Sequence, residues 1–272
     1  AEIIKWARET AGWTIEEISK KLKTSKENYL EIELGKKAPS FRQLKILAHY
    51  FKRPLVTFFL PKPPEEPSIS SYFRILPKSE AELSKELRLA IRKACYYQSI
   101  ANELMHDLSI DPIPKISKAM PYENPQEVAK KERKESGVSV EEQFKLKNAY
   151  DAFNKWREFI ESKNILVFQF KFPLTDARGF CLTNKLPYVI VINSEDNILA
   201  RIFTLFHEYA HLLLGISEIY LEEFNSNPEI EKWCDSFASE FLVPEEALKQ
   251  FIKSEKPTQE IIENLFRKFK VS

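Results

Sequence analysis

Cysteine, glycine and long apolar runs are all scarce in this chain of 272 residues. Its three cysteines, Cys95, Cys181 and Cys234, are odd in number and widely spaced, which excludes a disulfide framework and a thiolate metal cage. The longest apolar runs, such as 165–168 and 212–214, fall short of the roughly 18 residues that a membrane span needs. The opening residues do not resemble a signal peptide. We therefore expect no membrane partner and a location in the reducing cytoplasm.

An excess of one charge sign is also missing. Lysine and arginine total 41 and aspartate and glutamate total 40, for a formal net charge of +1. The field of the whole molecule therefore favours neither nucleic acid nor a membrane surface, and any charge argument has to be local. The hydrophobic fraction of 43% and the aromatic fraction of 12% are typical of a folded globular chain, so a fibrous or wholly disordered chain is excluded.

Proline divides the sequence into segments. Four of the sixteen prolines fall within 61–67, and this cluster predicts a stiff, extended linker because proline fixes φ and removes a backbone donor. We therefore expect a first domain over 1–60, a linker over 61–78 and a second domain over 79–272.

Helical periodicity dominates the first half of the second domain. Ser79 and Glu82 form a capping box, after which apolar residues recur every 3.6 positions, so one long helix is expected to end before Pro112. The stretch 112–137 contains the charge run KKERKE and is interpreted as a connector with one short, exposed helix. A further helix is expected over 139–162.

The apolar pattern then changes to a period of two or to continuous runs. ILVFQF (165–170), RGFCL (178–182) and YVIVIN (188–193) predict three strands of a small sheet. The last of these strands has two open interpretations, a sheet edge that adds a substrate strand and a strand buried on both sides. The predicted fold class is α+β, mostly α.

The segment 1–60 predicts four short helices and a final turn. Thr14 and Glu17 form a capping box, and only Lys23 and Thr24 separate the second predicted helix from the third, which is helix-turn-helix spacing. The stretch YLEIELGKKAPSFRQLKILAHYF is similar to the Xre family of phage-repressor-like helix-turn-helix proteins, and this resemblance covers nearly all of the segment. The predicted helices cover 2–11, 15–22, 25–34 and 40–50.

Local charge bears on whether this module binds DNA. Its nine lysines and three arginines against seven glutamates give a net charge of about +5, which favours contact with phosphates. The third helix, however, carries Glu27, Glu31 and Glu33, whose carboxylates repel phosphates unless they face away. DNA binding and docking of a partner protein or of a second copy, as a homodimer, therefore both remain open. The candidate phosphate contacts are Lys26, Lys36, Lys37 and Arg42.

The stretch FHEYAHL contains the pattern H-E-x-x-H, within a helix that Ser194 is expected to cap and that runs through Leu214. Residues four apart lie on one face of a helix, so His207 and His211 can offer two imidazole nitrogens to one metal ion. Glu208 follows His207 directly, so its side chain points away from the shared face of the two histidines. It can therefore reach a water molecule beside the ion without binding the ion, as a general base must. A pair of core histidines on an apolar helix is the less favoured alternative.

A zinc ion needs a third protein ligand, which we expect from the helix that Asn227-Pro228 opens. Glu231 is the best geometric choice, although a solvated first-turn carboxylate is the alternative. Asp235, one turn later, is expected to accept a hydrogen bond from a ligand histidine. Cys234 ranks low as a ligand, because its small size explains its place beside the other helix. The carboxylates considered are Glu222, Glu223, Glu229, Glu231, Asp235 and Glu240.

RIFTLFHEYAHLLLG followed by EKWCDSFASEFLVP resembles the ImmA/IrrE family of zinc-peptidase-like proteins. The resemblance covers about 70–272 and departs from the family pattern at Cys234, where Ala is usual, and at Asp235, where Asn is usual. The Xre module is a common partner of that domain. Further matches are FR at 73–74, RGF at 178–180 and IVIN at 190–193.

The resemblance implies roles for individual residues. His207, His211 and Glu231 match the family's zinc ligands, and Glu208 matches its catalytic acid/base. The implied function is a zinc metallopeptidase, with manganese able to replace zinc, that cleaves a partner protein in a stress or mobile-element response. The implied partner is a DNA-binding repressor. The alternative is a transcription regulator or antitoxin-like protein whose zinc domain senses and does not hydrolyse.

Overall fold

The computed structural model describes residues 2–66, 69, 83–216, 219–220, 228–252 and 258–271. They fall into two compact units, an N-terminal unit that ends within helix α5 at Arg92 and a C-terminal unit that begins at Lys93. The linker expected over 61–78 and the capping box of Ser79 lie largely outside the described residues, so the domain boundaries stay a prediction. None of the described helices is long and apolar enough to cross a membrane.

The N-terminal unit consists of short helices around one small apolar core. Polar caps begin three of the helices: the side chains of Thr14, Ser25 and Ser40 accept hydrogen bonds from backbone amides of the first turn. The core includes Ile18, Tyr29 and Phe51. The elements are α1 (Glu2–Thr10), α2 (Ile15–Leu22), α3 (Lys26–Glu33), α4 (Phe41–Phe51), the 3-10 helix η1 (Leu55–Phe59) and the first part of α5 (Lys85–Asp107).

The C-terminal unit is built on a four-stranded sheet with the order β1-β3-β2-β4. β1 (Ile165–Phe170) and β3 (Tyr188–Asn193) are parallel, whereas β2 (Gly179–Leu182) is antiparallel to both β3 and β4 (Ile219–Tyr220). β3 therefore lies between two strands and is buried, so it is not the edge strand that one interpretation required. The α+β fold class, mostly helical with a small sheet, is confirmed.

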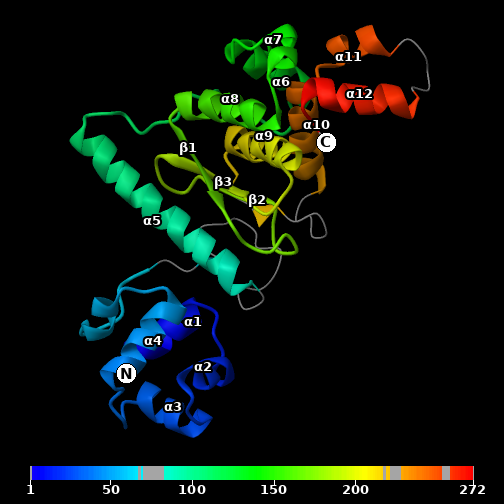
Figure 1. The fold of residues 1–272 in the computed structure, drawn as a ribbon. Coiled ribbons are helices and arrows are strands. Elements are labelled where there is room, and N and C mark those ends of the chain that lie inside the picture. The colour runs from blue at the N-terminus through cyan, green and yellow to red at the C-terminus, as the bar shows by residue number, and fades with distance from the viewer. Residues whose placement is uncertain are drawn as a thin grey trace. The chain divides into compact units, whose positions relative to one another are not determined.

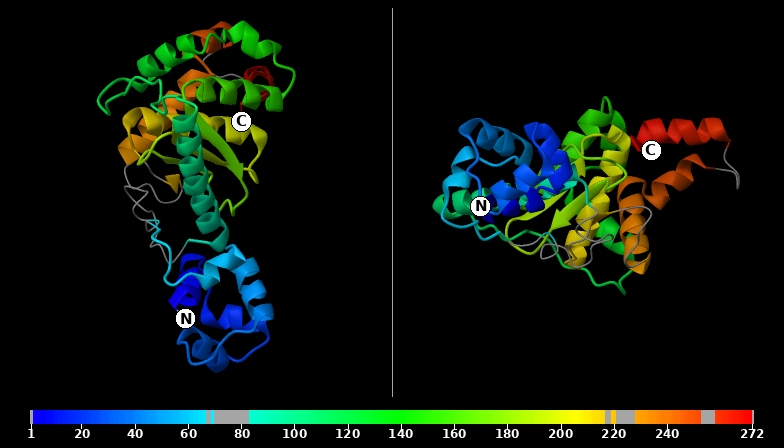
Figure 2. Two further views of the ribbon diagram at one scale, coloured as in Figure 1. Left: turned by 90° about the vertical axis from the view of Figure 1, so that its left-hand side faces the viewer. Right: turned by 90° about the horizontal axis from the view of Figure 1, so that it is seen from below.

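Helices cover both faces of this sheet. Ile165 and Val167 of β1 face the core formed with α8 (Ala149–Ser162) and α9 (Ile198–Leu214). Phe168 and Phe170 point to the opposite face, where Tyr97 of α5 packs at ring-centroid distances of 5.5 and 6.2 Å. Figures 1 and 2 show α9 beside α8 and α10 on one side of the sheet. The other helices are α6 (Pro125–Glu135), α7 (Val140–Lys145), α10 (Pro228–Leu242), α11 (Glu245–Phe251) and α12 (Gln259–Phe269).

Two expected helices differ from the structure at their ends. The helix expected over 139–162 is divided into α7 and α8, because Asn148 adopts an extended conformation and its side chain caps α8. Helix α9 is capped by Asn197 and not by Ser194. The backbone N–H of Ser194 donates instead to Phe170 at the end of β1, which keeps this residue with the sheet.

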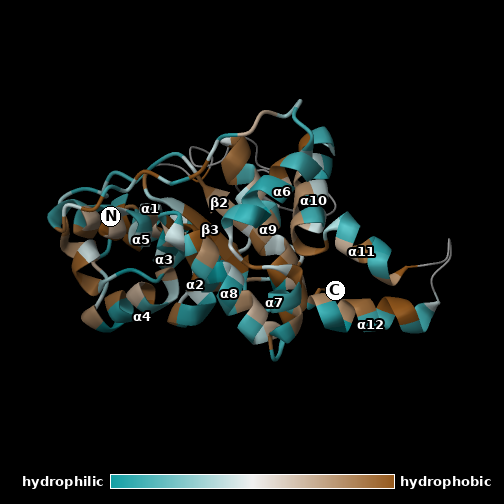
Figure 3. Ribbon diagram, turned by 90° about the horizontal axis from the view of Figure 1, so that it is seen from above, coloured by the Kyte–Doolittle hydropathy of each residue, from teal (hydrophilic) through white to brown (hydrophobic). Residues whose placement is uncertain are grey.

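The charge run KKERKE does form a short helix, α6, but one face of it is buried. Figure 3 shows α6 mainly hydrophilic and strands β2 and β3 mainly hydrophobic. Nevertheless, Glu132 is 1% exposed and Arg133 8% exposed. Glu132 accepts a hydrogen bond from the Tyr209 hydroxyl at 2.6 Å and pairs with Lys163. The fully exposed helix face expected from the sequence was therefore wrong, since tertiary contacts bury this face and supply partners for its polar groups.

Candidate metal centre

Helix α9 holds both histidines of the H-E-x-x-H pattern inside the C-terminal unit. The helix ends at Leu214, where Gly215 takes the left-handed conformation with φ of 69° that closes many helices. His207 and His211 lie one turn apart, and both side chains are fully buried. Their ring centroids are 4.9 Å apart, so both imidazoles face the same volume.

Helix α10 brings a carboxylate to the two imidazoles. It begins at Pro228, as predicted, and places Glu231 in its first turn. Glu231 Oε2 lies 3.0 Å from Nε2 of His207, and Glu231 Oε1 lies 3.4 Å from Nε2 of His211. The two Nε2 atoms are 3.1 Å apart. Within the described residues, His207, His211 and Glu231 form a group whose possible ligand atoms lie close enough together to hold one metal ion.

The spacing of these three atoms fits a tetrahedral zinc ion. Zinc binds histidine nitrogen and carboxylate oxygen at about 2.0–2.2 Å, so two ligand atoms at tetrahedral angles lie about 3.3 Å apart. The observed separations of 3.0 to 3.4 Å bracket that value. Two histidines and one carboxylate also leave a fourth coordination position open, as catalytic zinc sites do. The donor set and its geometry therefore both suit zinc.

Asp235 lies one turn beyond Glu231 and contacts the outer side of the cluster. Its Oδ1 is 2.9 Å from Nδ1 of His207, and its side chain is about half exposed. A proton on Nδ1 donated to Asp235 orients the ring so that Nε2 of His207, the nitrogen that a metal ion would bind, faces Glu231 and His211. This is the position that the sequence predicted for Asp235.

The charges of the cluster are strongly coupled. Burial disfavours a charged imidazole, but the hydrogen bonds of His207 with Asp235 and Glu231 outweigh that effect and raise the pKa of His207 to about 9. Burial lowers the pKa of His211. Burial acts to raise the pKa of Glu231, yet its hydrogen bonds with the two histidines bring that pKa down to about 2. Glu231 is thus held as a carboxylate, the form that ligates a metal.

Glu208 is fully buried and lies against the start of strand β2. A Cβ atom added to Gly179 would lie 3.1 Å from Oε1 of Glu208, 2.7 Å from Cγ2 of Thr204 and 3.0 Å from the carbonyl oxygen of Val191. Only a glycine therefore allows β2 to approach α9 this closely. In the sequence, RGF at 178–180 contributes only to a family resemblance and gives no sign of this role of Gly179, because the approach involves segments distant in sequence.

We expect Gly179→Ala to destabilise the C-terminal unit by about 1–3 kcal/mol through overpacking. The added methyl group meets two side chains, those of Thr204 and Glu208, and one backbone oxygen that cannot withdraw. Urea unfolding of the full chain measures the loss. Adding Thr204→Ser removes the nearest atom and should restore part of it, with Thr204→Ser alone as the control. Unchanged stability of Gly179→Ala would show that β2 and α9 are not in this close contact.

The remaining candidates of the sequence do not join the cluster. Cys234 is buried, and burial raises the pKa of its thiol, which disfavours the thiolate that binds metal. Glu229 is exposed, and Glu240 lies at the far end of α10. Glu222 and Glu223 lie outside the described residues.

The candidate DNA contacts all lie on the surface of the N-terminal unit. Lys36 and Arg42 are exposed, Lys26 pairs with Glu16, and Lys37 donates to Asn28. The three glutamates of α3 behave differently from one another. Glu33 is buried and pairs with Arg8 at 2.6 Å, whereas Glu27 and Glu31 are exposed. One of the three repulsive carboxylates is thereby turned inward.

Comparison with known families agrees with both units. Residues 1–60 match the helix-turn-helix domain, and residues 160–272 match the IrrE N-terminal-like domain, an M78 peptidase family. These two matches together correspond to the ImmA/IrrE architecture with a helix-turn-helix domain. The helix-turn-helix resemblance is thus confirmed over 1–60 and the ImmA/IrrE resemblance over 160–272, a range that includes the sheet, α9 and α10. The resemblance over 70–159 stays a prediction. No curated protein matches the chain.

Proposed function

We propose that the chain is a zinc-dependent metallopeptidase that cleaves a partner protein. The observation that carries this proposal is the cluster of His207, His211 and Glu231, with Glu208 next to the first ligand in sequence. The IrrE-like domain belongs to a peptidase family, which supports the same class of reaction. Zinc is the preferred ion, and manganese is expected to replace it because the set contains a carboxylate and two imidazoles.

Each residue of the site has a distinct role in the proposed reaction. The two histidines and Glu231 would hold a zinc ion, which would supply Lewis acidity at the peptide carbonyl and the attacking water. Glu208 would accept a proton from the attacking water and would return it to the leaving amine as the peptide C–N bond breaks. Asp235 keeps the ring of His207 in the orientation and tautomer that ligation requires.

The proposed substrate is a DNA-binding repressor, in a stress or mobile-element response. Support comes from the helix-turn-helix domain that accompanies the IrrE-like domain. The test is to incubate the zinc-loaded chain with candidate repressors of the same host, with and without a chelator, and to identify products by mass. We expect cleavage at one defined bond that the chelator abolishes. Intact repressors in every reaction would contradict this assignment.

A second candidate function is a regulator with a non-hydrolytic zinc sensor. The observation in its favour is the complete burial of His207, Glu208 and His211, because a sensor does not need a peptide to reach the ion. The carboxylate at position 208 favours the peptidase, since a sensor needs ligands and no base.

For the helix-turn-helix domain we expect weak, largely non-specific DNA binding that decreases steeply with salt. The net charge of about +5 attracts phosphates, but the exposed Glu27 and Glu31 oppose entry of α3 into a groove. Fluorescence anisotropy with duplexes of unrelated sequence, repeated at rising salt, measures this. A single preferred palindrome bound at physiological salt would instead support the regulator.

A further inference from the structure

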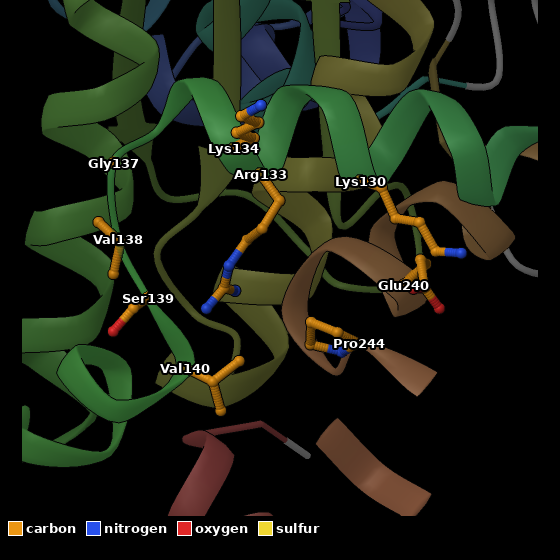
Figure 4. Close-up of a pocket in the computed structure, with 9 residues that line it drawn as sticks. All are labelled: Lys130, Arg133, Lys134, Gly137, Val138, Ser139, Val140, Glu240 and Pro244. Carbon is orange, nitrogen blue, oxygen red and sulfur yellow. The ribbon is translucent and has the colours of Figure 1, made fainter. Parts of the chain in front are cut away.

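A pocket of the C-terminal unit lies at the other end of α10 from Glu231. Glu240, which lines it, is nine positions after Glu231, which is about 14 Å along a helix. The pocket has a volume of about 400 Å³ and is formed by α6, the turn into α7 and the junction of α10 with α11 (Figure 4). Its lining residues are Lys130, Arg133, Lys134, Gly137, Val138, Ser139, Val140, Glu240 and Pro244.

Arg133 contributes a buried positive charge to this pocket. Figure 4 shows its side chain extending from α6 into the pocket toward Val140. The guanidinium donates to the carbonyl of Phe241 at 2.7 Å and to Oε1 of Gln143 at 2.6 Å, and it lies over the Trp156 ring. No carboxylate of the described residues forms an ion pair with it. The carbonyl at the end of α10 and the amide supply only partial negative charges, so the guanidinium lacks a full counter-charge.

Glu240 contributes a buried carboxylate to the same pocket. It is 7% exposed, and its Oε2 accepts a hydrogen bond from the backbone of Glu245 at 3.2 Å. Its Oε1 is buried and accepts no hydrogen bond from the described residues. Figure 4 shows Lys130 beside Glu240, but the Lys130 ammonium pairs with Glu127 at 3.0 Å. Buried carboxylate oxygens without a donor are uncommon, because the lost hydration is not replaced.

We propose that this pocket binds a small zwitterion, an amino acid or a short peptide, with its carboxylate on Arg133 and its ammonium group on Glu240. Such a ligand supplies the missing counter-charge and the missing donor at the same time. A pocket of about 400 Å³ is within the range that small-molecule sites occupy. Lys130 and Lys134 are exposed at its margin and favour the approach of a carboxylate.

The test is thermal melting of the zinc-loaded full chain with each standard amino acid and with glycylglycine, acetate and methylammonium as separate probes. We expect at least one zwitterion to raise the melting temperature by about 2–4 °C. Acetate and methylammonium, which carry one of the two charged groups each, should have much smaller effects. No shift with any zwitterion, or an equal shift with acetate, would overturn the proposal.

Substitutions separate this pocket from the metal centre, where amino acids could bind zinc directly. Glu240→Gln keeps an oxygen for the Glu245 amide but removes the charge, and Arg133→Gln removes the buried cation. Both should abolish the shift, whereas Lys131→Gln, an exposed residue of α6 outside the pocket, should retain it. If Arg133→Gln fails to fold, the melting-temperature shift of Glu240→Gln alone tests the proposal. A shift that survives in Glu240→Gln places the ligand elsewhere. The readout is binding, so it is independent of the proposed peptidase activity.

Discussion

Glu208→Gln is expected to abolish cleavage of the partner protein while zinc content and melting temperature stay close to those of the parent chain. The substitution preserves the size of the side chain beside Gly179 and leaves all three ligand residues in place. What disappears is the proton acceptor, and loss of a general base costs about 10² to 10⁴ in rate. Product formation measured by mass over time tests the expectation.

Glu195→Gln is the matched control, because it removes an exposed carboxylate that lies outside the metal centre. It should leave the rate unchanged. If Glu208→Gln relieved repression in cells as well as the parent chain does, the biological output would not pass through peptide hydrolysis. The zinc-sensor function would then replace the peptidase.

Glu231→Ala is expected to reduce bound zinc from about one equivalent per chain to a small fraction of that. Two histidines alone leave the ion short of protein ligands, and the buried imidazoles lose the carboxylate that faces them. Elemental analysis after dialysis measures the zinc. A chelator should lower the melting temperature of the parent chain but not that of Glu231→Ala, because only the parent has a bound ion to lose.

The control for this experiment is Glu229→Ala, which removes an exposed carboxylate from the same first turn of α10. It should keep the full zinc content. Full retention of zinc by Glu231→Ala would assign the third ligand to another residue, and a comparable loss in both variants would indicate damage to the helix and not to the site.

The geometry of the candidate metal centre could be predicted because it follows helical spacing. His207 and His211 are four residues apart, and Glu231 and Asp235 repeat that interval on the second helix. Each pair therefore lies on one face whatever the rest of the fold does. The contact of the two helices was the uncertain step, and the small side chain of Cys234 in the buried stripe of α10 was the local signal for it.

Features that depend on tertiary contacts could not be predicted in this way. The close approach of Gly179 to Glu208 joins a strand and a helix through backbone distances that no local pattern records. The burial of Arg133 within a charged run depends on the carbonyl of Phe241, more than a hundred residues away. Helices α7 and α8 are separate because the side chain of Asn148 caps α8 by accepting hydrogen bonds from its first backbone amides. The apolar pattern with helical spacing continues on both sides of Asn148, so the sequence did not show the break.

An anomalous difference map recorded at the zinc absorption edge, from crystals of the zinc-loaded chain, tests the central claim most directly. We expect one strong peak about 2.0–2.2 Å from Nε2 of His207, Nε2 of His211 and a carboxylate oxygen of Glu231. A peak bound by other residues, or no peak in protein that elemental analysis shows to be loaded with zinc, would contradict it.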